Sequence, residues 1–107
     1  MEREGRQLIK HTARGETLTV SLEGELDHHS AQSVRGELEA LIANSHVKRL
    51  VLDLSRLTFM DSSGIGVVLG RYKTLAKRGG GVAVRNPNPH VDRIFTMSGL
   101  YQIVDKL

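Results

Sequence analysis

Two strongly patterned segments of the chain are joined by the stretch Met60-Asp61-Ser62-Ser63-Gly64-Ile65-Gly66. Residues 49–54, before it, are almost unbroken in their apolar side chains and predict a buried strand. Residues 65–77, after it, carry apolar side chains at helical spacing and predict an amphipathic helix. Two hydroxyls and a carboxylate therefore fall at or near a helix N-terminus, where backbone N–H groups are free and the dipole favours negative charge. Gly64 and Gly66 leave room for another macromolecule, so the stretch suits the addition and removal of a phosphate.

The same residues also fit a simpler role. An Asp-Ser-Ser run before a helix is a common cap, in which a side-chain oxygen accepts a hydrogen bond from the first turn. The local sequence alone does not separate a cap from a modification site. It also does not choose between Ser62 and Ser63 as the modified residue.

The segments that precede this stretch predict a hairpin and a helix. Residues 8–11 and 18–22 have the pattern of short strands, with a turn at Arg14-Gly15-Glu16. Asp27 then stands where an N-cap belongs, and Asn44-Ser45 ends the helical pattern. The side chains expected to face inward from this helix are Ala31, Val34, Leu38, Leu41 and Ile42.

The segments that follow predict a strand, a third helix and a last extended piece. Gly79-Gly80-Gly81 ends the second helix, and residues 82–84 form a short strand. Asn88-Pro89 supplies an N-cap and a first helical residue, and Gly99 closes that helix. Residues 101–104 are expected to form a last strand or extended tail. The inward side chains of the third helix should be Val91, Ile94, Phe95 and either Met97 or Ser98.

The resulting order is strand, strand, helix, strand, helix, strand, helix, strand. Such alternation after a hairpin predicts an α/β fold with a mixed sheet of about four to five strands joined by crossover helices. A chain of 107 residues holds one core, so residues 1–107 are expected to form one domain. Residues 50–54 should lie at the centre of the sheet.

The composition indicates an ordinary globular protein. The chain is 39% hydrophobic and 25% charged, with a net charge of +3 and no cysteine. Without cysteine it has no disulfide and no thiolate metal site, which suits a reducing cytoplasm. No apolar run approaches the roughly 20 residues of a membrane span, and the polar residues 1–10 do not look like a signal peptide. We therefore expect a cytoplasmic protein that binds no membrane.

Several catalytic and binding functions require sequence patterns that this chain does not contain. Neither Ser62 nor Ser63 has the flanking glycines of a hydrolase nucleophile elbow, so no catalytic residue is assigned. No glycine-rich stretch continues into the Lys-Ser/Thr of a P-loop. The run Asp27-His28-His29 lacks the spacing of three or four that puts ligands on one helix face, so no metal site is expected.

Basic residues of the second helix raise the question of nucleic acid. Arg71, Lys73, Lys77 and Arg78 could contact phosphates, but aromatic residues make up only 4% of the chain and stacking platforms are scarce. We interpret Arg71, Lys73 and Lys77 mostly as solvated helix charges, and we expect no direct contact with nucleic acid.

Two stretches together closely resemble the anti-sigma factor antagonists, a family of STAS domains. The first is Gly24-Glu25-Leu26-Asp27-His28-His29-Ser30-Ala31. The second runs from Leu57 to Lys73 and contains Asp61-Ser62-Ser63-Gly64. The resemblance covers essentially the whole chain and is strongest to the sporulation members. Both stretches follow predicted strands, at the sheet edge where functional surfaces usually lie.

The resemblance implies that Ser63 is the phosphoacceptor and that Asp27 lies beside it. Partner-binding or nucleotide-proximal positions are then Asp27, Asp61, Ser62, Gly64 and Ile65. The unphosphorylated protein would bind an anti-sigma factor that is also a GHKL-type serine kinase, and so release a sporulation sigma factor. ATP and magnesium would belong to that kinase, and a PP2C-type phosphatase would restore the protein. The protein itself would be a monomer when free, with no cofactor and no enzyme activity.

Two other functions are compatible with the resemblance. One is an antagonist in a stress-response sigma pathway. The other is a weakly nucleotide-binding or nucleotide-hydrolysing STAS protein built around Asp27 and Ser63.

Overall fold

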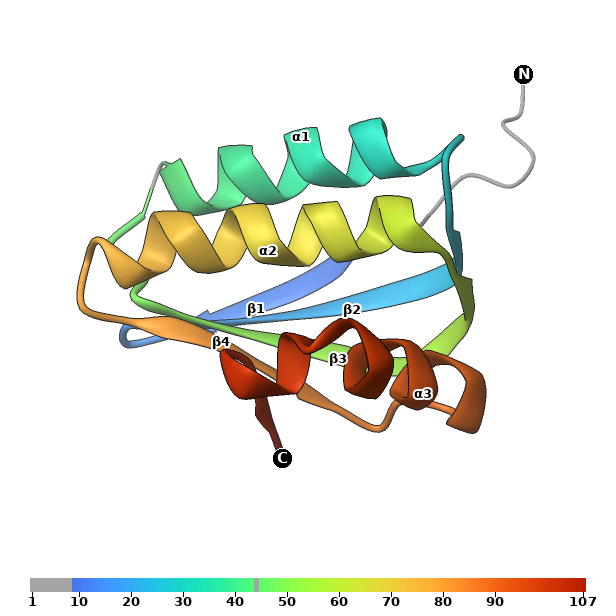
Figure 1. Cartoon of the computed structure of the whole chain (residues 1–107). Helices are drawn as coiled ribbons and strands as arrows, with labels where there is room; N and C mark the ends of the chain where they lie inside the picture. The colour runs from blue at the N-terminus through green and yellow to red at the C-terminus, as the bar shows by residue number, and fades with distance from the viewer. Residues whose placement is uncertain (1–8, 44) are drawn as a thin grey trace, which may run out of the picture.

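The computed structural model describes residues 9–43 and 45–107 (Figure 1). Its elements alternate after an opening hairpin, as the sequence predicts. In chain order they are β1 (Lys10–Arg14), β2 (Thr17–Leu26), α1 (Ala31–Ala43), β3 (Arg49–Met60), α2 (Ser62–Ala76), β4 (Gly81–Arg85), α3 (Pro89–Ser98), the 3-10 helix η1 (Leu100–Gln102) and β5 (Asp105–Lys106).

Within the described residues the strands form one mixed sheet in the order β1-β2-β3-β4-β5. β1 and β2 are antiparallel, and each later pair is parallel. The prediction of an α/β fold with a mixed sheet is confirmed. The hairpin turn is Gly15-Glu16, with Gly15 at a φ of +61°. β1 starts at Lys10 rather than residue 8, which lies outside the described residues. It extends to Arg14 because its ladder with β2 continues up to this short turn.

The helices lie along one face of the sheet, in the order α1, α2, α3 (Figure 1). The buried side chains of all three helices belong to one apolar cluster, together with the side chains of β3 and β4 that point to that face, such as Leu52 and Val84. Leu18, Val20 and Leu22 alternate inward along β2, and Leu50 and Leu52 do so on β3. α1 buries Val34, Leu38 and Ile42 from the predicted face, while Ala31 and Leu41 are half-buried at its margin. No helix in the described part of the chain combines the length and apolar character of a membrane span.

β3 is longer than predicted, because the segment expected to be a loop continues the strand to Met60. Two β-bulges explain the difference. Between the pairs Ser21↔Asp53 and Glu23↔Arg56, and again between Gly24↔Leu57 and Glu25↔Phe59, β3 carries one extra residue relative to β2. The buried residues are therefore Leu54, Leu57 and Met60, at a spacing of three rather than two.

α2 begins at Ser62, three residues before the predicted start at Ile65. Asp61 is its N-cap, with an extended backbone and a carboxylate that accepts the N–H of Ser63 at 2.8 Å. The small and hydroxyl residues that weakened the helical pattern form its first turn. The helix ends at Ala76, and Gly79 in the following turn has a φ of +81°.

The third helix is capped as predicted, but the chain after it differs from the expectation. Asn88 accepts the N–H of Val91 at 2.8 Å, Pro89 is the first helical residue and Gly99 ends α3 with a φ of +84°. Val91 and Phe95 are buried, whereas Met97 and Ser98 are exposed. The prediction of a last strand or extended tail at residues 101–104 is wrong. The chain forms η1 there, and β5 is confined to Asp105–Lys106.

Candidate functional site

Ladder pairing brings the two motifs of the sequence together at the carboxyl edge of the sheet. Leu26 at the end of β2 pairs with Met60 at the end of β3, and the N–H of Asp61 donates to the carbonyl of Leu26 at 3.3 Å. Asp27 and Asp61 each follow one member of this pair. Two acidic residues 34 positions apart in the chain therefore leave the sheet next to each other.

The hydroxyls of Ser62 and Ser63 are presented by the first turn of α2. Ser62 is exposed and Ser63 is half-buried, and neither hydroxyl has a hydrogen-bond partner among the described residues. The turn's own N–H groups are less free than the sequence suggested. Asp61 takes the N–H of Ser63 with its carboxylate, and its carbonyl accepts the N–H of Gly64 at 3.0 Å. The helix terminus thus already holds one anion, beside two unengaged hydroxyls.

Asp27 forms the N-terminal cap of a turn that leads into α1. Its Oδ1 accepts the N–H groups of His29 at 2.9 Å and Ser30 at 3.1 Å, and the Ser30 hydroxyl accepts the Asp27 N–H. The N–H of Ala31 completes the turn on the Asp27 carbonyl. The hydrogen bond from the Ser30 N–H, reinforced by that from His29, lowers the pKa of Asp27 below its usual value although partial burial opposes this. Asp27 therefore stays ionised, with Oδ2 unengaged among the described residues.

The two histidines after Asp27 are exposed. Their rings meet edge to face, with centroids 5.6 Å apart. Oδ1 of Asp27 is occupied by backbone N–H groups, and the described part of the chain contains no group of three or more histidine, cysteine or acidic side chains placed to hold a metal. The arrangement at Asp27 is that of a capped turn.

Gly64 and Ile65 face the protein more than they face solvent. A Cβ on Gly64 would lie 2.4 Å from Cγ of Met60 and 3.1 Å from a methyl carbon of Leu26. This glycine therefore brings the start of α2 close to the strand ends, rather than clearing a path for a partner. Ile65 is half-buried against the core. Gly66 is exposed, with open space where a Cβ would lie.

The start of α3 joins the same edge, which the sequence alone did not indicate. The side-chain amide of Asn88 donates to the carbonyls of Leu57 and Thr58 at 3.2 and 3.3 Å. Nε2 of His90 lies 3.3 Å from the carbonyl oxygen of Met60, and the His90 ring stacks on Phe59. The ends of β2 and β3 and the start of α3 therefore meet at the edge of the sheet where α2 begins.

Two of the basic residues considered for nucleic acid, Arg71 and Arg78, have structural roles, and the interpretation as a solvated charge is wrong for Arg71. Arg71 is only 5% exposed, and its Nη2 bonds Glu39 of α1 at 3.1 Å. Burial lowers the pKa of its guanidinium, which Glu39 partly offsets. Arg78 donates to the carbonyls of Ile42 and Val47 at 3.2 and 2.8 Å, and so satisfies the end of α1.

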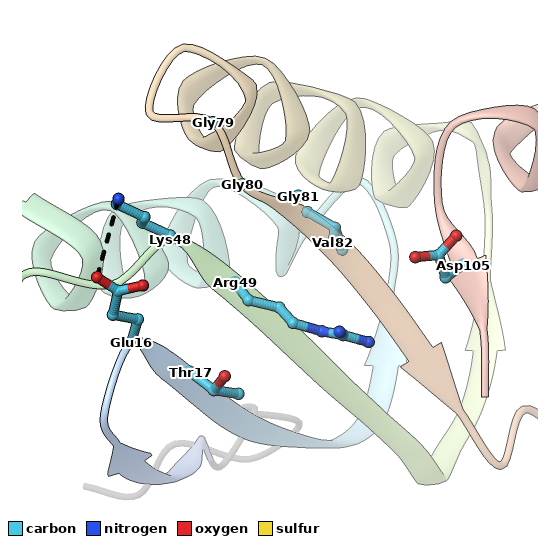
Figure 2. Close-up of a pocket in the computed structure, with 9 residues that line it drawn as sticks. All are labelled: Glu16, Thr17, Lys48, Arg49, Gly79, Gly80, Gly81, Val82 and Asp105. Atoms are coloured by element: carbon cyan, nitrogen blue, oxygen red, sulfur yellow. Dashed lines mark ion pairs between the residues drawn. The ribbon is translucent and has the colours of Figure 1, made fainter.

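A separate hollow of about 450 Å³ lies at the opposite edge of the sheet (Figure 2). It forms where the connection from α2 to β4 presses on the start of β3. A Cβ on Gly80 would lie 1.6 Å from the carbonyl oxygen of Lys48, which accepts the N–H of Gly81. The ion pair of Lys48 with Glu16, at 3.8 Å, lies on its wall. The hollow lies at the far end of α2 from Ser63, roughly 20 Å away, which is the length of that helix. We attribute the shape of the hollow to the close packing of the connection between α2 and β4.

Residues 9–107 match the STAS domain family, and the chain belongs to that family. It is 48% identical over 87 residues to the anti-sigma F factor antagonist of Paenibacillus polymyxa, covering 81% of this chain and 74% of the relative. It is 33% identical over 88 residues to the anti-sigma-B factor antagonist of Bacillus subtilis (strain 168), covering 82% and 79%.

The fold is similar to that of a solved antagonist in two chemical states. The unphosphorylated anti-sigma factor antagonist SpoIIAA superposes with a TM-score of 0.81 at 35% identity, covering 94% of this chain and 87% of that one. The phosphorylated form of the Bacillus cell fate determinant SpoIIAA gives a TM-score of 0.73 at 34% identity, covering 94% and 91%. A fold of this kind is therefore compatible with both states.

Proposed function

We propose that this chain is an anti-sigma factor antagonist that phosphorylation switches off at Ser63. The observation that carries the proposal is the unengaged Ser63 hydroxyl on the first turn of α2, beside the paired ends of β2 and β3. The similarity to antagonists of anti-sigma factors supports the class of partner. The chain then acts as a regulatory binding module in the cytoplasm, monomeric when free, rather than as an enzyme.

In this proposal the unphosphorylated chain binds an anti-sigma factor that is a serine kinase of the GHKL type, and the sigma factor is released. The kinase brings ATP and magnesium and transfers the γ-phosphoryl group to Oγ of Ser63. The hydroxyl proton leaves, an O–P bond forms and ADP departs. A PP2C-type phosphatase hydrolyses the phosphoserine and restores the binding form.

The charge introduced at Ser63 explains how binding is lost. A phosphoserine carries about −1.5 to −2 charges at pH 7. Asp61 already uses the N–H of Ser63, so the new anion lies next to a carboxylate that has taken the best donor. A kinase must also hold its nucleotide phosphates near this hydroxyl, so the product meets further negative charge. A thousandfold loss of affinity needs only about 4 kcal/mol, which one badly placed charge can supply.

The site is held by backbone ladder bonds and by the Asp61 cap, neither of which involves the Ser63 hydroxyl. We therefore expect an electrostatic and steric block with little backbone movement. A structure of the phosphorylated chain in which α2 is displaced or unwound would contradict this.

The sporulation pathway is the better supported of the two sigma pathways. Identity to the anti-sigma F factor antagonist of P. polymyxa is 48%, against 33% for the anti-sigma-B factor antagonist of B. subtilis. Capture of the partner on the immobilised unphosphorylated chain, with each anti-sigma factor offered in turn, separates the two. Preferential retention of the stress-pathway factor would overturn the sporulation assignment while keeping the class.

The decisive experiment is the intact mass of the chain after incubation with the anti-sigma factor kinase and Mg-ATP, followed by peptide mapping. We expect one added phosphate, located on Ser63. Ser62→Ala is the matched control and should still be modified, whereas Ser63→Ala should not. Modification of Ser63→Ala together with its absence from Ser62→Ala would move the switch to the neighbouring hydroxyl. No modification of wild-type chain by an active kinase would overturn the proposal.

A further inference from the structure

The second bulge of β3 gives Phe59 an unusual position. Leu57 pairs with Gly24 and Phe59 pairs with Glu25, so Thr58 is the extra residue, and its hydroxyl bonds the carbonyl of Gly24 at 3.0 Å. Bulges near functional sites commonly redirect a side chain. Here Met60 is buried, whereas its neighbour Phe59 is 39% exposed and contacts His90 in the first turn of α3.

Phe59 is held in place although it is exposed. The His90 ring stacks on it with centroids 5.1 Å apart and an interplanar angle of 15°. His90 is itself fixed by the contact of Nε2 with the Met60 carbonyl and by the bonds of nearby Asn88 to β3. An aromatic side chain fixed before binding loses little conformational entropy when a partner covers it.

The position of Phe59 connects it to the phosphorylation site. It lies two residues before Asp61, the N-cap of α2, and its ladder partner Glu25 lies two residues before Asp27. The exposed ring and the Ser63 hydroxyl therefore belong to one edge of the molecule. Met97 is more exposed, at 78%, but it stands seven residues beyond His90, about 10 Å along the axis of α3.

We propose that Phe59, stacked on His90, is the apolar anchor by which the unphosphorylated chain binds its anti-sigma factor, and that the anti-sigma factor supplies an apolar pocket that accepts the phenyl ring. This inference rests on the proposed function and adds a contact outside the Ser63 motif. Aromatic side chains, phenylalanine among them, are enriched at protein interfaces, where a few anchors supply most of the binding energy. Such an anchor contributes affinity that phosphorylation opposes but does not remove.

The test is isothermal titration calorimetry of the unphosphorylated full chain with purified anti-sigma factor kinase. Phe59→Ala should bind about thirtyfold more weakly or worse, and Phe59→Leu should lie between it and wild type. Met97→Ala is the matched control, since it removes a more exposed apolar side chain, and should stay within about threefold of wild type. Urea unfolding and circular dichroism verify that each variant is folded.

The outcomes separate this inference from the proposed function. If wild type does not bind the anti-sigma factor, the proposed function fails and the anchor fails with it. If wild type binds and both folded Phe59 variants match it, the anchor alone is overturned. Phosphorylation kinetics give a second readout. Phe59→Ala should raise KM for the chain by about the factor lost in affinity and leave kcat within about twofold, because in this proposal the ring contributes to binding and takes no part in phosphoryl transfer.

His90 acts as a positioning residue through the stack. His90→Ala should weaken binding less than Phe59→Ala does. His90→Phe keeps a stacked ring but loses the Nε2 contact, and should restore wild-type affinity. If His90→Phe binds as weakly as His90→Ala, the stack is not what positions the ring, and this part of the proposal is wrong.

Discussion

Gly64 packs so closely against Met60 that a single added carbon would lie 2.4 Å from the Met60 Cγ. The same added carbon would also lie 3.1 Å from a methyl carbon of Leu26. The closeness brings the helix that carries Ser63 directly onto the ends of β2 and β3. The geometry of the site therefore depends on a residue that the partner does not need to touch.

The first prediction compares two glycines of α2. Gly64→Ala should destabilise the chain by about 1–3 kcal/mol, because the added methyl overpacks a buried contact. Gly66→Ala, with open space around it, should be neutral or stabilising by up to about 1 kcal/mol through helix propensity. Urea unfolding of both variants measures the difference. Equal stabilities would show that Met60 moves aside at little cost.

The second prediction concerns charge at Ser63, the proposed phosphoacceptor. Ser63→Ala should fold normally and bind the anti-sigma factor constitutively, since a hydroxyl without a partner is lost and no charge is added. Ser63→Asp should bind at least about tenfold more weakly, a cost of about 1.4 kcal/mol. Titration calorimetry with the anti-sigma factor measures both. A folded Ser63→Ala chain that does not bind would count against the mechanism.

The third prediction is a pH dependence that originates at Asp27. The hydrogen bond from the Ser30 N–H, with that from His29, lowers its pKa in the folded chain. The resulting stability is present above the unfolded value of about 3.9 and is lost as pH falls through the folded value. Asp27→Asn keeps an oxygen acceptor but not the charge. Wild type should exceed it in stability at pH 7 by less than about 1 kcal/mol.

The measurement compares the free energies of unfolding of wild type and Asp27→Asn. The comparison is needed because Asp53 and Asp92 also have lowered pKa values and contribute to the acid dependence of both chains. The difference in free energy of unfolding should shrink as pH falls from 5 toward 3, well below neutrality. A difference that stays constant over this range would mean that the charge of Asp27 does not support the cap.

The fourth prediction concerns the buried guanidinium between α1 and α2. Glu39→Gln leaves Arg71 with a weaker partner, and Nη1 of Arg71 already lacks one within the described residues. We expect a loss of about 1 kcal/mol, moderated because Glu39 is more than half exposed. The double variant with Arg71→Met should recover most of that loss, since an apolar replacement removes the unpaired charge. Chemical unfolding of the four chains completes the cycle.

The order of elements could be predicted from the sequence because most of them follow simple periodicities. β2 alternates, α1 repeats its apolar residues at helical spacing, and the caps Asn88 and Gly99 bound α3. The carboxyl half of β3 was not predicted as a strand, because two bulges place its buried residues three apart. This spacing fits neither a regular strand nor a helix. The burial of Arg71 was not predicted, because a basic residue on an amphipathic helix is usually solvated. Its burial depends on how α1 packs against α2.

The site was predictable in part for the same reason. Asp27 and Asp61 could be expected at one edge, since parallel strands end together. The contribution of α3 to the site could not be predicted, because it depends on side chains that reach across the end of the sheet. Examples are the contacts of Asn88 with Leu57 and of His90 with Met60. The sequence also does not show which of Phe59 and Met60 is buried, because the bulges of β3 decide it.

The two extra residues that β3 carries relative to β2 also constrain how such a chain can diverge. Removing one residue between Leu54 and Met60 would reverse which side chains point to the core, so either Met60 would lose its place under Gly64 or Phe59 would turn inward. Substitution at exposed positions of this segment leaves the pairing intact. Antagonists built in this way can therefore change partners by exchanging side chains, while the length of the segment stays fixed.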